Sequence, residues 1–257
     1  MRLKRISFSL ILILAAVTVF AADETCPITS WSYPEGPANP WPATYCSGAN
    51  QSPIANNASQ RTQDQSLPLA VVNYAGNVAF PITLKNTGTE LKATPMFDGR
   101  LTWGTVSAQL TQFHFHVPAE HKLDIWADAA AELHLVHQVG DRIYVIAVAI
   151  RRGHENPALT ALLKLAPRAC YSAASISNDQ RVLMKALLPL EMRRYITYEG
   201  SLTTPQCNRG VTFILMNDGI EASAEQIDRL KIIRTPTGNA RAPQANGNRV
   251  TYRTAGK

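Results

Sequence analysis

Residues 112–116 read Gln-Phe-His-Phe-His, and residues 132–137 read Glu-Leu-His-Leu-Val-His. Apolar and polar residues alternate in the first stretch. This alternation predicts a strand, because successive side chains of a strand point to opposite faces of a sheet. His114 and His116 therefore share one face with Gln112. One strand thus offers two imidazoles and an amide on the same side.

The second stretch adds a third imidazole if its strand pairs with the first. His134 shares its face with Glu132 and Val136. Three neutral imidazoles can hold Zn²⁺ and leave a fourth tetrahedral position open for water, which is typical of catalytic rather than structural zinc sites. Side-chain oxygens such as those of Gln112 and Glu132 can accept the other N–H of a ligating imidazole. The simpler alternative is that each histidine binds only a backbone carbonyl in a half-buried sheet.

The remaining strands that the sequence predicts are short and are separated by glycine and asparagine. They lie at residues 71–74, 82–84, 142–150 and 211–216. Helical spacing is confined to residues 158–165, 181–188 and 225–233. Ser177 with Gln180, and Ser223 with Gln226, have the spacing of capping boxes at helix starts. No repeat or linker divides the chain, so we expect one mainly β (α+β) domain with short peripheral helices.

Four motifs, in family order along the chain, resemble those of the α-class carbonic anhydrases. They are the two histidine stretches, Gln-Ser-Pro-Ile at residues 51–54 and Gly-Ser-Leu-Thr-Thr-Pro at residues 200–205. The resemblance extends over about residues 31–249, and it implies a large, mostly antiparallel twisted sheet with the metal on its central strands. It also implies a zinc enzyme that catalyses the reversible hydration of CO₂ to bicarbonate and a proton by zinc-bound hydroxide. The zinc ligands that it implies are His114, His116 and His134.

The resemblance assigns further roles around the metal. Thr203 stands at the position of a gatekeeper that accepts a hydrogen bond from the zinc-bound hydroxide. Glu120 matches the carboxylate that takes the threonine's own hydrogen, and Thr204 is a second polar group beside the substrate. Gln112 and Glu132 match the residues that orient the first and third zinc ligands.

CO₂ has no net dipole, so an apolar wall rather than hydrogen bonds would hold it. The residues that match this wall are Val136, Val145, Leu202 and Phe213. Phe213 stands where the family usually has tryptophan, which keeps an aromatic surface and changes the pocket volume. His121 and His137 resemble structural histidines of the family rather than ligands.

Residues 86–90, Asn-Thr-Gly-Thr-Glu, depart from the family pattern. Thr89 stands where the fastest members have a histidine that relays the proton to buffer. Threonine has no group that titrates near neutral pH, so we expect proton transfer to limit turnover. If the alignment is shifted by one residue, Glu90 faces the cleft instead. A second hypothesis is a catalytically weak, carbonic-anhydrase-like binding module.

Residues 1–21 have the pattern of a secretory signal peptide. Basic residues precede an apolar stretch over residues 6–20, and the small residues Ala21 and Ala22 follow it. We expect cleavage after Ala21, which leaves residues 22–257 as the catalytic domain of a secreted or periplasmic protein without a membrane span. The alternative is a membrane anchor, but the apolar stretch is shorter than the ~20 residues of a spanning helix.

The chain has 25 Lys and Arg against 19 Asp and Glu, a formal net charge of +6. Residues 229–257 hold seven basic residues and no acidic one, so they form a basic C-terminal tail, which we expect to be solvated. This tail lacks the interleaved aromatic residues of a nucleic-acid surface. The expected partners are therefore CO₂ and bicarbonate, with no nucleic acid. The sequence is compatible with a monomer or a homodimer.

Export makes the four cysteines candidates for disulfides. Four cysteines allow three pairings. Cys46 and Cys207 match the pair that joins these segments in many secreted members of the family, and we expect them to be bonded. Cys26 and Cys170 can then either pair with each other or remain free thiols.

Overall fold

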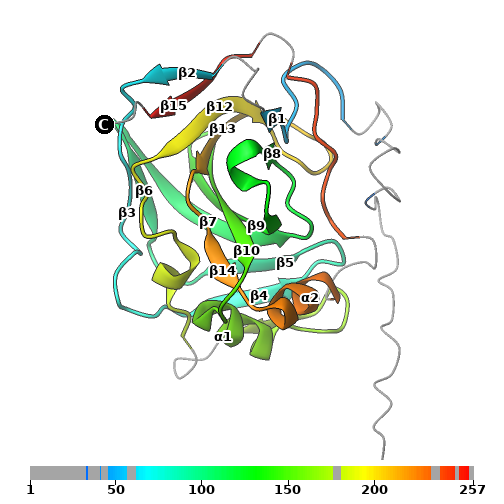
Figure 1. Cartoon of the computed structure of the whole chain (residues 1–257). Coiled ribbons are helices and arrows are strands. Elements are labelled where there is room, and N and C mark those ends of the chain that lie inside the picture. Colours follow the sequence, from blue (N-terminus) through cyan, green and yellow to red (C-terminus); the bar gives the residue numbers. More distant parts are fainter. Residues whose placement is uncertain are drawn as a thin grey trace, which may run out of the picture.

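The computed structural model, drawn in Figure 1, describes residues 33, 41, 46–56, 62–175, 181–232, 238–246 and 249–254. The strands in these ranges are β1 (Ala55–Asn56), β2 (Thr62–Gln65), β3 (Ala70–Val72), β4 (Ile82–Asn86), β5 (Leu91–Pro95), β6 (Arg100–Trp103), β7 (Val106–His116), β8 (Lys122–Leu123), β9 (Ala129–Val139), β10 (Arg142–Arg152), β11 (Ala173–Ser175), β12 (Tyr195–Ser201), β13 (Arg209–Met216), β14 (Ile220–Ala222) and β15 (Thr251–Thr254). The helices are α1 (Pro157–Leu165) and α2 (Ala224–Ile232), with short 3₁₀ helices η1 (Asp124–Trp126) and η2 (Met184–Leu187). The expected signal peptide lies outside the described residues.

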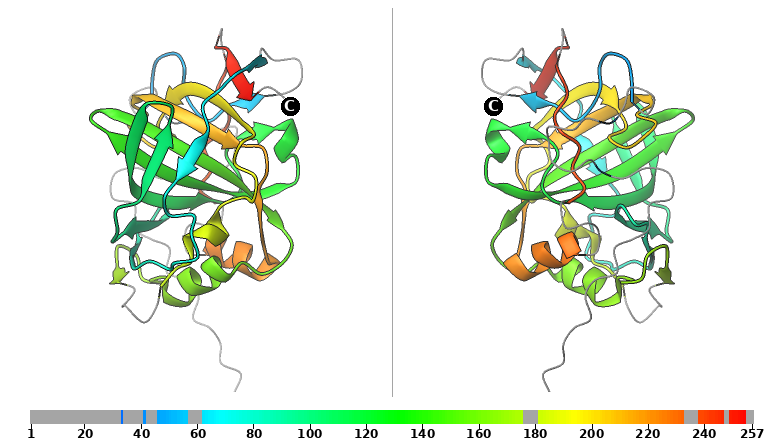
Figure 2. Two further views of the ribbon diagram at one scale, coloured as in Figure 1. Left: turned by 90° about the vertical axis from the view of Figure 1, so that its left-hand side faces the viewer. Right: turned by 90° about the vertical axis from the view of Figure 1, so that its right-hand side faces the viewer.

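One large twisted sheet dominates the fold (Figure 1), and Figure 2 shows its twist from two sides. Among the described residues it has 13 strands, whose main path is β11-β4-β5-β7-β9-β10-β13-β12-β15-β2. β3, β6 and β14 attach beside this path, and β1 pairs with β8 separately. Most neighbouring strands are antiparallel, as expected, but β10 runs parallel to β13 and β14, and β15 runs parallel to β2.

The central strands β7, β9 and β10 are each 11 residues long, and the last four residues of β7 and the middle of β9 and β10 are buried on both faces. Phe113, Phe115, Leu133 and Leu135 point to one face and join a large core that also includes residues of α1 and α2. The histidines point to the other face, where a smaller apolar cluster includes Val145. Burial on both faces fixes the register, because a slip of one residue would exchange the two layers.

A β-bulge precedes the histidines of β7. The pairing with β9 shifts between Leu110 and Gln112, so Thr111 is an extra residue. Its hydroxyl donates to the carbonyl of Val136 at 3.1 Å. Because the bulge shifts the alternation by one residue, Leu110 and Phe113 both reach the large core, and Gln112 turns to the histidine face.

The strands predicted at residues 71–74, 82–84, 142–150 and 211–216 are confirmed as β3, β4, β10 and β13. The helices expected near residues 158–165 and 225–233 are α1 and α2.

Asn156 caps α1, because its side-chain oxygen accepts the N–H groups of Ala158 and Leu159. The capping box of α2 is confirmed: Gln226 N–H donates to Ser223 Oγ at 3.2 Å, and Ser223 N–H donates to Gln226 Oε1 at 3.1 Å. The capping box expected at residues 177–180 lies outside the described residues.

The helix predicted over residues 181–188 is wrong, because only the 3₁₀ helix η2 forms there. Val182 instead exchanges two backbone hydrogen bonds with Phe80, at 2.9 and 3.0 Å. Pro189 follows directly and disfavours a helical conformation at Leu188. The apolar residues of this segment are therefore spaced as they are because their side chains are buried, and not because the segment is a helix.

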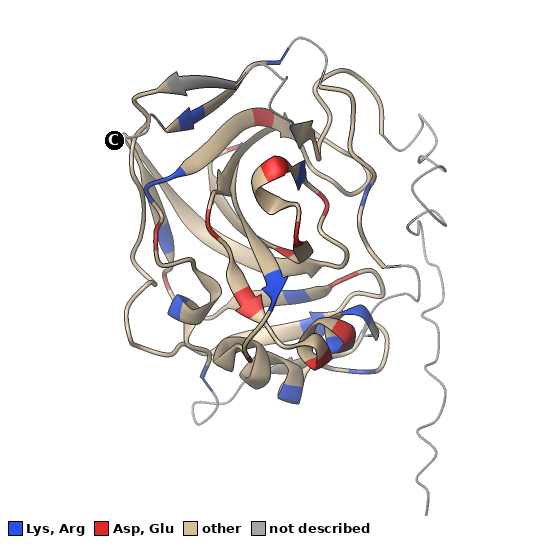
Figure 3. Cartoon of the chain, viewed as in Figure 1, with Lys and Arg blue, Asp and Glu red and all other residues tan. Residues whose placement is uncertain are grey.

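The expectation of a solvated C-terminal tail is wrong for its described residues. β15 joins the large sheet between β12 and β2. Arg241 is only 8% exposed, and its guanidinium donates to Gln51 Oε1 at 2.9 Å and to the Ser52 carbonyl at 2.6 Å. Arg249 stacks over the Tyr198 ring at 5.5 Å. Figure 3 shows basic and acidic residues interspersed over the described part of the fold.

The disulfide expected between Cys46 and Cys207 is confirmed, with 5.1 Å between the two Cα atoms. Cys170 is also disulfide-bonded, so it is not a free thiol, and Cys26 lies outside the described residues. Within the described ranges, no helix has both the length and the apolar character needed to cross a membrane.

Candidate metal centre

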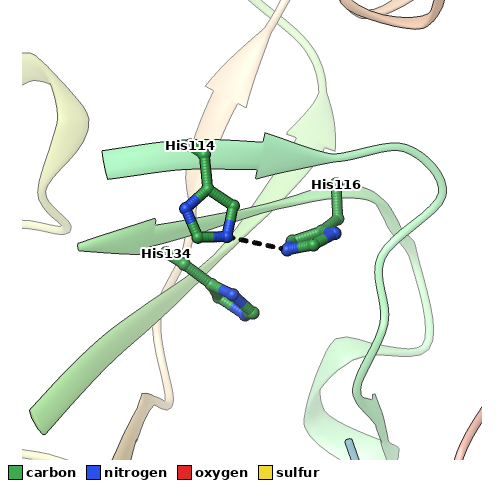
Figure 4. Close-up of side chains that lie close together, drawn as sticks. All are labelled: His114, His116 and His134. Atoms are coloured by element: carbon green, nitrogen blue, oxygen red, sulfur yellow. Dashed lines mark hydrogen bonds between the residues drawn. The ribbon is translucent and has the colours of Figure 1, made fainter. Parts of the chain in front are cut away.

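The two histidine strands are neighbours, as the sequence predicts. β7 pairs with β9 so that His114 lies opposite His134, and His116 lies opposite Glu132. Figure 4 shows the three imidazoles converging from these strands. One ring nitrogen from each lies within 4.8 Å of the other two, and all three side chains are buried. The fold thus brings together a group of three histidines that can hold a metal ion.

Each of these imidazoles is oriented by an oxygen on the side away from the point of convergence. The three pairs are His114 Nδ1 with Gln112 Oε1 at 2.8 Å, His116 Nδ1 with the Asn239 carbonyl at 2.8 Å, and His134 Nε2 with Glu132 Oε1 at 2.7 Å. Such oxygens accept a hydrogen bond and donate none, so each neutral ring keeps its proton on the outer nitrogen. The inner nitrogens therefore present lone pairs.

Two of these lone pairs face each other. His114 Nε2 and His116 Nε2 are 3.0 Å apart. Neither nitrogen carries a proton in its neutral ring, so a cation that binds both nitrogens would stabilise this approach. Nitrogen ligands at ~2.0–2.1 Å from a tetrahedral Zn²⁺ lie ~3.3 Å apart, which is close to the observed separation. The donor set therefore fits zinc.

Glu132 is the acceptor at the centre of the hydrogen bonds behind the histidines. Its carboxylate accepts the backbone N–H groups of Glu120 and His121 at 2.8 Å each, His121 Nδ1 at 2.6 Å and His134 Nε2 at 2.7 Å. Burial would raise the pKa of Glu132, but His121 and His134 hold it well below its usual range. Burial lowers the pKa of His134 and Glu132 raises it, with a net increase. An ionised acceptor of this kind makes a ligating imidazole more basic.

His121 and His137 have hydrogen-bond partners at both ring nitrogens. His121 Nδ1 is bound to Glu132, and its Nε2 lies 2.7 Å from the Tyr198 hydroxyl. His137 lies in the large core on the other face of β9, where its Nε2 is 2.9 Å from the Tyr74 hydroxyl. Burial lowers the pKa of His121, and it lowers the pKa of His137 to about 4. Both rings are therefore neutral near pH 7.

Glu120 is a fully buried carboxyl beside His116. Its Oε1 accepts the backbone N–H of Arg241 at 2.9 Å, and its Oε2 has no hydrogen-bond partner within the described residues. Burial raises the pKa of Glu120 to about 8, and the Thr203 hydroxyl acts in the opposite direction. Thr203 thus lies next to this carboxyl.

A cavity of about 210 Å³ opens over the histidines. It is lined by Glu90, Lys92, Gln112, His114, His134, Val136, Val145, Leu202, Thr203, Thr204 and Phe213. The four residues expected to form the apolar wall are all in this lining, together with both threonines. His116, Glu120 and Glu132 are fully buried behind it.

The apolar wall is built as a row across adjacent strands. Val136 of β9 pairs with Val145 of β10, and Val145 pairs with Phe213 of β13. Paired residues point to the same face of a sheet with Cβ atoms ~5 Å apart, so the three side chains form one surface. Gln112 pairs with Val136 at one end of the row, next to the histidines. The sheet register therefore places the wall beside the candidate metal centre.

Residues 35–256 match the family model of the eukaryotic-type carbonic anhydrases. The chain belongs to this family. A carbonic anhydrase of Klebsiella pneumoniae is 33% identical over 243 residues, which cover 90% of this chain and 91% of that protein. The structure of an α-carbonic anhydrase from Thermovibrio ammonificans with the inhibitor sulfanilamide is similar, with a TM-score of 0.71 and 30% identity over 80% of this chain and 87% of that one. Carbonic anhydrase Cah3 from Chlamydomonas reinhardtii in complex with acetazolamide has a TM-score of 0.73 and 27% identity, covering 88% and 99%. Both the α-class fold and the enzyme class expected from the sequence are confirmed.

The turn at residues 87–90, where we expect the proton-relay position from the sequence, is held by several hydrogen bonds. Thr87 N–H donates to the Glu90 carbonyl, and Glu90 N–H donates to Thr87 Oγ1, at 3.0 Å each. Gly88 has a φ of +83°, which a side chain would disfavour. The Thr89 hydroxyl lies 3.2 Å from that of Thr87. Glu90, rather than Thr89, is in the cavity lining, so a carboxylate extends from this turn toward the histidines.

Sequence reasoning missed Asn239, which lies 123 residues beyond His116. Besides accepting the His116 N–H through its carbonyl, Asn239 binds the backbone of β7 and the residue after it. Its Oδ1 accepts Val117 N–H at 2.8 Å, and its Nδ2 donates to the Phe115 carbonyl at 2.9 Å. No strand or helix pattern marks the segment around Asn239. Only a comparison of this segment with the carbonic anhydrase motifs could have pointed to the residue.

Proposed function

We propose that this chain is a zinc enzyme that hydrates CO₂ reversibly to bicarbonate and a proton. One observation carries the proposal: three buried imidazoles converge, and the outer nitrogen of each is bound to an oxygen. His114, His116 and His134 are the proposed ligands, and Gln112 and Glu132 orient the first and third of them. When bound, Zn²⁺ lowers the pKa of a coordinated water to about 7, a value for which carbonic anhydrase is itself the reference case.

Thr203 and Glu120 would orient the nucleophile. The buried Glu120 carboxyl has an unpartnered oxygen, and Thr203 lies beside it at the cavity wall. If the Thr203 hydroxyl donates to Glu120, its oxygen can only accept a hydrogen bond from the nucleophile. A lone pair of the nucleophile then points toward the substrate carbon. Thr204 supplies a second hydroxyl at the same wall.

The apolar wall would hold CO₂ and keep competing water out. Val136, Val145 and Phe213 form a continuous surface across three strands, and Leu202 closes it from the segment after β12. CO₂ has no net dipole, so contact with apolar side chains is sufficient to seat it. Phe213 offers a smaller ring than the tryptophan usual in the family, and this leaves more room in the pocket.

Proton export is the step that we expect to limit turnover. A threonine at position 89 cannot accept a proton near neutral pH. We also propose that residues 1–21 are a secretory signal and that residues 22–257 act outside the cytoplasm, as a monomer or homodimer. The disulfide between Cys46 and Cys207 supports an oxidising compartment, because such bonds are rare in the cytosol.

Two measurements on the same protein test the proposal: zinc content and CO₂ hydration followed with a pH indicator in stopped flow. The wild type should bind one zinc ion per chain and hydrate CO₂. His134→Ala should lose zinc and retain less than about a tenth of the activity, because one of three ligands is gone. His154→Ala is the matched control, since the His154 side chain is 96% exposed. A wild type that binds zinc without accelerating hydration would support the binding-module alternative instead.

A further inference from the structure

Glu90 is a charged residue within the cavity that the steps above do not use. Its Oε2 lies 3.8 Å from His114 Nε2, the nitrogen that faces the proposed metal. The side chain is only 15% exposed, and it lines the same cavity as the apolar wall. A carboxylate in this position is within reach of any ligand that approaches the metal from the cavity.

The backbone of Glu90 is fixed by the turn that precedes β5. Thr87 N–H and Thr87 Oγ1 both donate to the Glu90 carbonyl, at 3.0 and 3.1 Å, and Glu90 N–H donates back to Thr87 Oγ1. Two residues later Lys92 lies opposite His114 in the sheet and lines the same cavity. The cavity thus holds one fixed acidic residue and one basic residue beside the proposed metal.

Glu90 stands beside the ligand group rather than within it. Two groups of possible ligands have their ligand atoms within 4.8 Å of one another among the described residues, the three histidines and His121 with Glu132 and His134, and neither contains Glu90. Glu90 nevertheless lies close to His114, and its negative charge raises the pKa of His134. The electric field of Glu90 therefore reaches two of the three histidines. Glu90 therefore stands outside these groups, and its charge can act on a ligand that approaches the metal from the cavity.

We propose that Glu90 is a specificity-determining residue that disfavours anions at the open coordination position of the metal. The proposal rests on the zinc function proposed above and deepens it. Two like charges ~5 Å apart, at an effective dielectric constant of ~20, change an affinity by roughly a hundredfold. Lys92 and solvent reduce this effect, and we expect at least about tenfold. Product bicarbonate, which is an anion, is released more easily for the same reason.

Anion binding to the Co²⁺-substituted protein tests this role without measuring turnover. Thiocyanate and imidazole, an anion and a neutral ligand, are titrated against the visible absorption of the cobalt centre. Glu90→Gln removes the charge with little change of shape, and Glu90→Asp keeps the charge. We expect Glu90→Gln to bind thiocyanate at least about tenfold more tightly, with imidazole unchanged and Glu90→Asp close to the wild type. Lys92→Gln, which removes the opposite charge, should bind thiocyanate more weakly.

The possible failures are distinguishable. Normal Co²⁺ binding with equal thiocyanate affinity in Glu90→Gln and the wild type would overturn the role of Glu90 and leave the proposed function standing. An equal increase in affinity for imidazole and thiocyanate in Glu90→Gln would also overturn the role of Glu90, because the substitution would then act by making room in the cavity and not by removing a charge. A wild type that binds no Co²⁺ would overturn the metal centre, and the role of Glu90 with it.

Discussion

Acidification should destabilise the fold through His137. This imidazole is fully buried, with Nε2 2.9 Å from the Tyr74 hydroxyl and Nδ1 3.3 Å from the Tyr144 carbonyl. Burial lowers its pKa from 6.5 to about 4. The unfolded chain therefore binds a proton in a range where the folded chain does not, so stability falls as the pH drops from about 6.5 to about 4. The loss from this one group is about 2 kcal/mol at pH 5 and about 3 kcal/mol at pH 4.

Urea unfolding at pH 7 and pH 5 measures this loss. His137→Gln cannot take up a proton, and its amide can bond to both the Tyr74 hydroxyl and the Tyr144 carbonyl. Whatever its stability at pH 7, this variant should lose about 2 kcal/mol less than the wild type on going to pH 5. His154→Gln replaces an exposed histidine and should follow the wild type. Equal losses in His137→Gln and the wild type would refute the reasoning.

Gln112→Leu removes the acceptor of His114 Nδ1, so zinc affinity in a chelator competition should fall by about 10–100-fold; an unchanged affinity would mean that the amide does not orient the ligand. Reduction of the Cys46–Cys207 bond should lower the free energy of unfolding by up to about 5 kcal/mol, because the bond closes a loop of 161 residues. A melting temperature that does not change on reduction would contradict this estimate. Thr89→His should raise kcat with little change in kcat/KM, and kcat that is independent of imidazole buffer in both proteins would reveal another proton relay.

The histidine strands could be predicted because two constraints act on the same residues. The alternation in residues 112–116 indicates a strand, and three imidazoles with a carboxylate and an amide make sense together as a zinc site. Burial on both faces of the central strands then fixes which residues pair. His114 lies opposite His134 for this reason, and the wall residues on β9, β10 and β13 follow from the same register.

The contacts that complete the site could not be predicted, because they are made by backbone atoms or by residues without a pattern. The hydrogen bonds made by the Asn239 carbonyl and the Arg241 N–H involve backbone atoms, which almost any residue type could supply. The type of side chain at these positions therefore does not predict them. The bulge at Thr111 has no signature of its own either. Charge alone was misleading in the C-terminal tail, because arginines that bind carbonyl groups can be buried.

The position of Asn239 has a consequence for biosynthesis. His116 leaves the ribosome 123 residues before the carbonyl that orients it. At ~5–20 residues per second, this interval lasts roughly 6–25 s, and for most of it the nascent chain contains all three histidines but not the complete set of their partners. Metal capture by a correctly oriented site therefore belongs to the last stage of synthesis or to the time after it. A chain that ends before residue 239 would carry every ligand and still lack the geometry that the metal requires.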